Sequence, residues 1–256
     1  MTRAGTGFTL VEMAVVLAVV GLLLAGVTYT LQAQVAQREQ NETRRRLDEA
    51  RELVLAFALV SGRLPCPARE ASSGEEMRNT AGECKDAAGT ENYYGGLLPA
   101  RSIGVQNIDS DGFARDAWGN RIRYAVAKSV TGCGGSPAMP HFTSAPNLKA
   151  NGISCLPDDL VVCKSSRGIG ARSCGATGNA LTNQNLVVAV VYSVGKNFAM
   201  AGSGGADEAA NLNGDAVFVN HPPAPAGAAD GEFDDRLTWI TVGELYGRLI
   251  SAGVLP

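Results

Sequence analysis

Histidine is scarce in this chain of 256 residues, which has only two, His141 and His221. Each lies next to a proline, a setting that disfavours a Ser-His-Asp catalytic site. The Gly-x-Ser-x-Gly and His-Glu-x-x-His motifs and the phosphate-binding glycine loop are absent. Cys-x-x-Cys is absent too, which disfavours a zinc site. We therefore predict no catalytic residues and no enzyme, with a membrane-anchored periplasmic enzyme kept as an alternative.

Strong charge of either sign is also missing, since the formal net charge is −3. The one dense basic run, Arg44 to Arg46, is followed at once by Asp48 and Glu49. Such a mixture is typical of a solvated helix face, whereas a nucleic-acid-binding surface needs a basic stripe. No nucleic-acid partner is therefore predicted.

Formal charge is absent altogether from Met13 to Gln37. A helix needs about 20 apolar residues to cross a bilayer, so this stretch is long enough. It differs from a secretory signal, because the apolar run is too long and no Ala-x-Ala site follows it. A plain membrane anchor would explain everything here except Gly7-Phe8 and Glu12. An embedded carboxylate is costly, so Glu12 is a functional hypothesis by default.

The stretch Gly-Phe-Thr-Leu-Val-Glu at residues 7–12, followed by a long apolar helix, resembles the processing motif of type IV pilins and type II secretion pseudopilins. The resemblance implies that a prepilin peptidase cuts between Gly7 and Phe8 and then methylates the new amine of Phe8. It also implies that Glu12 pairs with the N-terminal amine of a neighbouring subunit. Glu12 is thus predicted to be an assembly determinant.

Six cysteines all lie beyond the apolar segment. An even number there favours disulfides in an oxidising compartment. Local closure favours the pairs Cys66–Cys84 and Cys163–Cys174, which leaves Cys133–Cys155 as the third.

Helical signals continue beyond the apolar run without proline or glycine, and Leu47, Ala50, Val54 and Phe57 recur at helical spacing. We expect this amphipathic half to end at Ser61-Gly62. A coiled-coil stalk is a rival interpretation, but the heptads are too few. The predicted organisation is a leader at 1–7, a long helix at 8–61 (8–31 in a membrane or filament core, 32–61 amphipathic) and a periplasmic or extracellular domain at 62–256 with disulfides.

The rest of the chain alternates short strand-like runs with turns. Residues 186–194 are nearly all apolar and are predicted to form a central strand. A capping box, Thr241 to Glu244, precedes a closing helix at 244–251. The predicted fold class is α+β, a long N-terminal transmembrane or filament helix packed on an antiparallel sheet, as in pilins. The strands are expected at 121–127, 160–163, 186–194, 216–219 and 236–242.

The run Asp116-Ala-Trp118-Gly119-Asn120 is similar to a motif of the major pseudopilin of type II secretion, except that alanine stands where that family has proline. We interpret it as a structural turn, in which Gly119-Asn120 supplies a flexible backbone and Trp118 packs under the sheet. A binding role is the alternative.

A second stretch resembles the same family, where a calcium ion lies between a Tyr-Ser-x-Gly loop and an aspartate pair. Here the resemblance implies Ca²⁺ ligands at Asn197, Asp234 and Asp235. Lys196 departs from the pattern, and the connection between the two parts is much longer than the family's. The alternative is that both aspartates only begin a strand. Calcium is therefore a possible cofactor, and no other is predicted.

Together these features predict a single-pass inner-membrane prepilin-like subunit whose globular domain lies in the periplasm before the subunit joins a type IV pilus or type II secretion pseudopilus. The expected partners are the prepilin peptidase, other pilin or pseudopilin subunits, the inner-membrane assembly platform and the membrane. The insertions near 128–180 and 198–230 favour a minor subunit. The alternative from another class is a pilin-anchored module that binds an exported protein, DNA or a surface.

Overall fold

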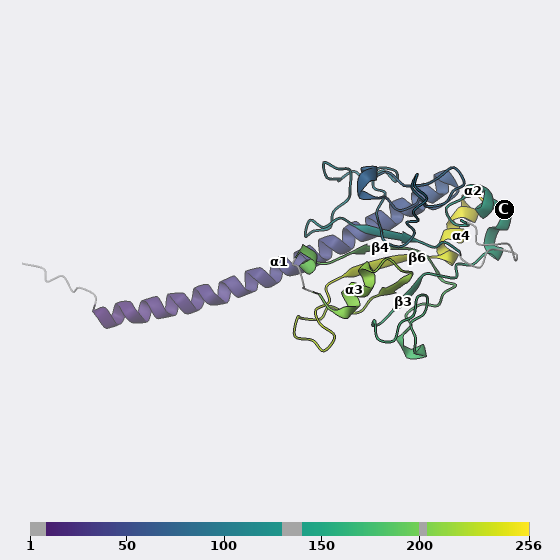
Figure 1. Ribbon diagram of the computed structural model, residues 1–256. Helices are drawn as coiled ribbons and strands as arrows, with labels where there is room; N and C mark the ends of the chain where they lie inside the picture. Colours follow the sequence, from purple (N-terminus) through teal and green to yellow (C-terminus); the bar gives the residue numbers. More distant parts are fainter. Residues whose placement is uncertain (1–8, 130–139, 200–203, 256) are drawn as a thin grey trace, which may run out of the picture. The chain divides into compact units, whose positions relative to one another are not determined.

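The computed structural model describes residues 9–129, 140–199 and 204–255, without the side chains of residues 24–33 and 199. The chain divides into two compact units, Met1–Glu42 and Thr43–Pro256. One helix, α1 (Leu10–Ser61), contributes to both units. The fold is α+β with an N-terminal helix and an antiparallel sheet (Figure 1), as the sequence predicts.

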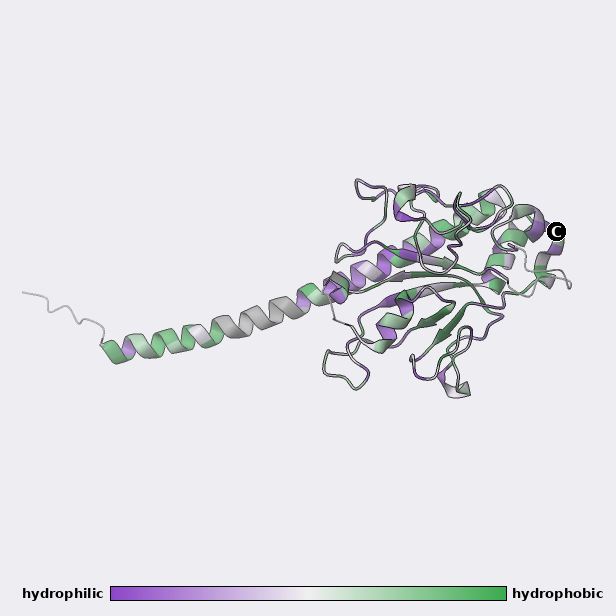
Figure 2. Ribbon diagram, in the orientation of Figure 1, coloured by the Kyte–Doolittle hydropathy of each residue, from purple (hydrophilic) through white to green (hydrophobic). Residues whose placement is uncertain are grey.

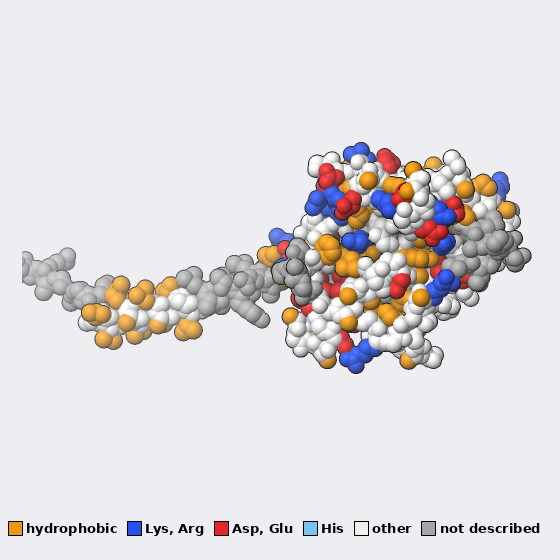
Figure 3. All heavy atoms as spheres, in the orientation of Figure 1, with side chains coloured by type: hydrophobic (Ala, Val, Ile, Leu, Met, Phe, Trp, Pro, Cys, Tyr) orange, Lys and Arg blue, Asp and Glu red, His pale blue; other side chains and the backbone are white. Residues whose placement is uncertain are grey.

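In the first unit, every described side chain of α1 from Leu10 to Leu23 is exposed. Most of these side chains are hydrophobic, and they stand out along the helix in Figures 2 and 3. Gly7 and Phe8 lie outside the described residues. Within the part of the chain that is described, no helix combines the length and the hydropathy that a membrane span needs.

In the second unit, α1 buries the stripe that the helical spacing predicts. Leu47, Ala50 and Val54 are buried, and Phe57 packs against the same core. The helix ends at Ser61 because Gly62 adopts a left-handed conformation, with φ of 67°, and donates its N–H to the carbonyl of Ala58 at 2.9 Å. The part of α1 from Thr43 to Ser61 therefore contributes to the core of this unit.

The main sheet has four antiparallel strands in the order β1-β2-β4-β6. The central strand β4 is buried along its whole length, as expected for a nearly continuous apolar run. β6 is an edge strand, and β1 falls within a stretch that the sequence patterns did not mark as a strand. The bounds are β1 (Gly96–Leu97), β2 (Arg123–Val126), β4 (Val187–Ser193) and β6 (Arg236–Thr241).

The remaining two strands do not join this sheet. β3 (Val161–Cys163) pairs in parallel with β5 (Val217–Val219) in a separate two-stranded sheet. The prediction of one antiparallel sheet is wrong for these two strands. The sequence shows each apolar run, but the runs are short, and nothing in them specifies a partner so distant along the chain.

Short helices complete the second unit. The closing helix α4 (Val242–Ser251) begins where Thr241 Oγ1 accepts the N–H of Glu244 at 3.2 Å. The Glu244 carboxylate binds Arg51 of α1 and thereby ties the two helices together. The others are α2 (Ala145–Asn151), α3 (Ala206–Leu212) and 3-10 turns at Glu70–Ser72, Gly152–Ser154, Thr177–Asn179 and Asn197–Ala199.

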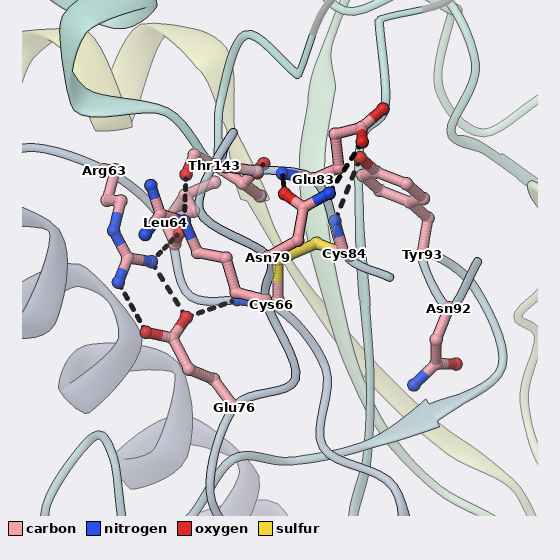
Figure 4. The surroundings of a disulfide bond; sticks show 12 residues. Arg63, Leu64, Cys66, Glu76, Asn79, Glu83, Cys84, Asn92, Tyr93 and Thr143 are labelled. Carbon is pink, nitrogen blue, oxygen red and sulfur yellow. Dashed lines mark hydrogen bonds and ion pairs between the residues drawn. A yellow bond between two sulfur atoms is a disulfide. The ribbon is translucent and has the colours of Figure 1, made fainter. Parts of the chain in front are cut away.

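Two disulfides close local loops, in the pairs that local closure favours: Cys66–Cys84 and Cys163–Cys174. Figure 4 shows the first of them among polar contacts. Glu76 accepts the N–H of Cys66 at 3.0 Å and forms an ion pair with Arg63, and Tyr93 Oη accepts the N–H of Cys84 at 3.1 Å. This disulfide therefore fixes the segment after α1 to the rest of the unit.

Cys155 is also disulfide-bonded. Its predicted partner, Cys133, lies outside the described residues.

Candidate functional site

The N-terminus of α1 is closed by a reciprocal capping box. Thr9 Oγ1 accepts the N–H of Glu12 at 3.2 Å, and the Glu12 carboxylate accepts both the N–H and the hydroxyl of Thr9 at 2.8 Å. Within the described residues, Glu12 therefore has hydrogen-bond partners before any neighbouring subunit is present. The sequence carries a signal for this role of Thr9, because Thr-x-x-Glu before an apolar run is typical of a capping box.

A second group of residues forms an acidic cluster, made of Glu208, Asp234 and Asp235. One carboxylate oxygen of each lies within 4.8 Å of the others. Glu208 lies in the first turn of α3, and the two aspartates immediately precede β6. Two elements far apart in the sequence thus bring three carboxylates together.

The predicted Asn197 also reaches this cluster. Its Nδ2 donates to both carboxylate oxygens of Glu208 at 3.0 and 3.2 Å, so it approaches as a hydrogen-bond donor. The Lys196 side chain is exposed, and its backbone N–H donates to Asp234 Oδ2 at 3.0 Å. The lysine that departs from the family pattern therefore leaves its charge outside the cluster.

Asp234 Oδ1 is buried and has no hydrogen-bond partner among the residues that the structure describes. It lies close against Gly195, where the backbone has φ of 68° and an added Cβ would come within 1.4 Å of this oxygen. Only glycine permits that approach. The backbone at Gly195 therefore lies against an acceptor oxygen that no described residue satisfies.

Burial and mutual repulsion perturb the cluster. Burial, followed by the charge of Glu208, raises the pKa of Asp234 to about 6. Burial raises the pKa of Asp235 well above its usual value, although Asn211 Nδ2 donates to its carboxylate at 2.8 Å. Three carboxylates held this closely therefore oppose full ionisation unless a cation is bound.

The donor chemistry fits a divalent cation such as Ca²⁺, which takes six to eight oxygen ligands. Glu208, Asp234 and Asp235 would supply carboxylate oxygens, and Asp234 Oδ1 is the buried acceptor without a partner. Glu208 was missed from the sequence because it lies within the insertion near 198–230 and no local motif marks it. Glu208 joins the two aspartates only because α3 packs beside the start of β6.

The predicted turn at residues 116–120 is built around Asp116, which is 2% exposed. Its carboxylate accepts the N–H groups of Trp118 and Asn120 at 3.0 and 2.8 Å and the hydroxyl of Ser193 at 2.6 Å. Trp118 is half-buried. Asp116 takes the buried position because its carboxylate satisfies three donors there. The turn also contacts the acidic cluster's loop, since Asn120 Nδ2 donates to the Gly195 carbonyl at 2.6 Å.

The comparisons with known proteins identify one region. Residues 3–28 match the family model of the prokaryotic N-terminal methylation motif. This motif is the prepilin-type signature of type IV pilins and pseudopilins, and the chain carries it. No curated protein and no solved structure matches the chain. The resemblance recognised at residues 7–12 is therefore confirmed.

Proposed function

We propose that this protein is a prepilin-like structural subunit that is cut after Gly7, methylated at Phe8 and assembled into a type IV pilus or type II secretion pseudopilus. The match of residues 3–28 to the methylation motif carries the proposal. The exposed apolar residues of α1 support it, because a filament core or a bilayer would cover them. The prepilin peptidase, sibling subunits and an inner-membrane assembly platform are the corresponding partners.

In this proposal residues 62–256 form the periplasmic domain while α1 holds the subunit in the inner membrane. The domain is enlarged by segments around 128–180 and 198–230, which contain α2, α3 and the second sheet. A subunit that repeats along a filament is tightly packed on all sides, whereas a rare or tip subunit has room for such additions. We therefore favour a minor subunit.

Glu12 would act in assembly. Its carboxylate already accepts two hydrogen bonds from Thr9, so the isolated subunit does not leave it unsatisfied. Processing would give a neighbour's Phe8 a cationic amine, and a charge-assisted hydrogen bond to Glu12 would then form only in the assembled register.

The experiment is intact-mass measurement of the membrane-extracted protein made with and without prepilin peptidase. We expect a chain beginning at methylated Phe8 only when the peptidase is present. A chain that still begins at Met1 beside active peptidase would refute the proposal. In a second step, Glu12→Gln should be processed but lost from sheared filaments, whereas Glu49→Gln, an exposed change on the same helix, should be retained.

We also propose that the acidic cluster binds Ca²⁺. The close approach of three carboxylates and the buried Asp234 oxygen without a partner support this. Calorimetric titration of chelator-treated protein with CaCl₂ should give one saturable site that Glu208→Gln and Asp234→Asn remove. Asp230→Asn is the matched control, because Asp230 is exposed and pairs with Arg167. Calcium binding that survives both cluster substitutions would refute the assignment.

A further inference from the structure

The chain contains two Asn-Gly steps, Asn151-Gly152 and Asn213-Gly214. Such a step can cyclise, because glycine has no Cβ to keep its backbone nitrogen away from the carboxamide of the preceding asparagine. Whether it does so in a folded protein depends on the freedom of the glycine N–H and on the direction of the asparagine side chain. The two steps differ in both respects.

Asn213-Gly214 lies in the exposed turn between α3 and β5. Asn213 Oδ1 accepts the backbone N–H of Asp215 at 2.8 Å. A contact from a side chain to the N–H two residues later is an Asx turn, which folds the carboxamide forward over the Gly214 peptide bond. The Asp215 N–H also polarises the carboxamide carbonyl, so Asn213 Cγ becomes a better electrophile.

The Gly214 nitrogen is available to attack that carbon. No residue in the described ranges accepts its N–H. Gly214 is exposed and has φ of 79°, and an added Cβ there would lie in open space. The nucleophile and the electrophile of this step are therefore adjacent, and solvent reaches both.

Asn151-Gly152 has the same two residues in a different environment. The Gly152 N–H donates to the carbonyl of Leu148 at the end of α2. Asn151 and Gly152 are half-buried, and the Asn151 side chain makes no capping hydrogen bond to the turn that follows. The fold therefore restrains the nitrogen at this step and leaves the one at Gly214 free.

We propose that Asn213 is a site of spontaneous deamidation. Hydroxide removes the proton of the Gly214 N–H, and the nitrogen forms a bond to Asn213 Cγ. The Cγ–Nδ2 bond breaks, and Nδ2 takes a proton from water and leaves as ammonia. Water then opens the resulting succinimide at one of its two carbonyls, which gives aspartate or isoaspartate at position 213. This inference does not depend on processing at Gly7 or on the calcium site.

The product would weaken the turn that leads into β5. Asn213 Nδ2 donates to Asp215 Oδ2 at 2.8 Å, and Asp215 Oδ1 accepts the N–H of Val217, the first residue of β5. Deamidation replaces the Nδ2 donor by a carboxylate, which repels the carboxylate of Asp215. The N–H of Val217 should therefore exchange faster with solvent after deamidation.

The test incubates the full-length protein in detergent micelles at about pH 8 in heavy-oxygen water, followed by digestion in ordinary water and mass spectrometry. Heavy oxygen should enter at Asn213 at least about fivefold faster than at Asn151, because a hydrogen bond restrains the Gly152 nitrogen. In guanidinium chloride, which unfolds the chain, the two rates should become nearly equal. Electron-transfer fragmentation distinguishes isoaspartate from aspartate.

Asn213→Gln should slow incorporation at this position by about tenfold or more, because the longer side chain must close a larger ring. Asn151→Gln is the matched control, and thermal unfolding verifies that both variants remain folded. Hydrogen exchange at Val217 should become faster during incubation in wild type and Asn151→Gln but not in Asn213→Gln. No conversion at Asn213, an equal or faster rate at Asn151 in the folded protein, or a rate difference that persists in the unfolded chain would each overturn the proposal.

Discussion

Replacing Asp234 by asparagine should stabilise the protein when calcium is absent. Asparagine can keep its oxygen toward the N–H groups of Lys196 and Asn197, which Asp234 Oδ2 accepts at 3.0 and 3.3 Å. Its NH₂ group would then replace the buried Oδ1 that lacks a partner. The substitution also removes one of three carboxylates that lie within 4.8 Å of each other.

The size of this effect follows from the pKa of Asp234, which rises from 3.8 to about 6 through burial and then the charge of Glu208. Each pKa unit corresponds to about 1.4 kcal/mol, but this carboxyl group is partly solvated and its interactions are screened. We therefore expect a gain of about 1–2 kcal/mol for Asp234→Asn at neutral pH. Because the folded state binds the proton more tightly than the unfolded state, wild-type stability from this group falls as the pH rises from about 4 to about 6.

The assay is denaturant unfolding of the full-length protein between pH 4 and pH 8, with chelator or with about 1 mM CaCl₂. In chelator the difference between Asp234→Asn and wild type should grow as the pH rises through this window. Calcium should stabilise wild type by about 1–3 kcal/mol and leave Asp234→Asn unchanged. Asp230→Asn, the exposed control, should shift stability by less than about 0.5 kcal/mol under both conditions.

A loss of stability in Asp234→Asn with chelator present, at every pH, would refute this reasoning. It would mean that the charged carboxylate is stabilised by contacts other than a bound cation. A pH-independent difference between the two proteins would also contradict the perturbed pKa.

Three further expectations concern the second unit. Burial lowers the pKa of His141 to about 4, so the free energy of unfolding should fall as the pH drops from about 6.5 to about 4. This pH dependence is opposite in sign to that expected from Asp234. In urea unfolding, His141→Phe should flatten the slope. The double substitution Cys66→Ser and Cys84→Ser should cost about 3 kcal/mol, from the loop of 18 residues that the disulfide closes, and unchanged unfolding would contradict it. Asp116→Ala should cost about 2–4 kcal/mol, because it leaves one buried and two partly buried donors without their acceptor. The exposed Asp111→Ala should change the unfolding free energy by less than about 0.5 kcal/mol.

Features that depend on neighbours in the sequence could be predicted well. The methylation motif from Gly7 to Glu12 is a contiguous string, and the stripe of Leu47, Ala50 and Val54 has its own helical period. β4 could be placed because a nearly continuous apolar run can be satisfied only in the interior. Two members of the acidic cluster, Asp234 and Asp235, could be named because they are adjacent in the sequence.

Features that depend on contacts between distant parts of the sequence could not be predicted. The sequence contained both short runs of the second sheet, yet the parallel pairing of β3 with β5 depends on backbone groups that any two strands share. Trp118 and Trp239 look alike as isolated aromatic residues and both are half-buried, and only the structure shows that Trp239 packs against the core.

The sequence by itself thus determined the prepilin-type signature, the long helix with its two halves and the central strand, because each depends on local composition or period. Tertiary structure alone decided that Glu208 joins Asp234 and Asp235, and that β3 pairs with β5 in a separate sheet. Both arrangements come from segments that are remote along the chain. Their meeting is set by how α1, α3 and the two sheets pack, which no single stretch of sequence specifies.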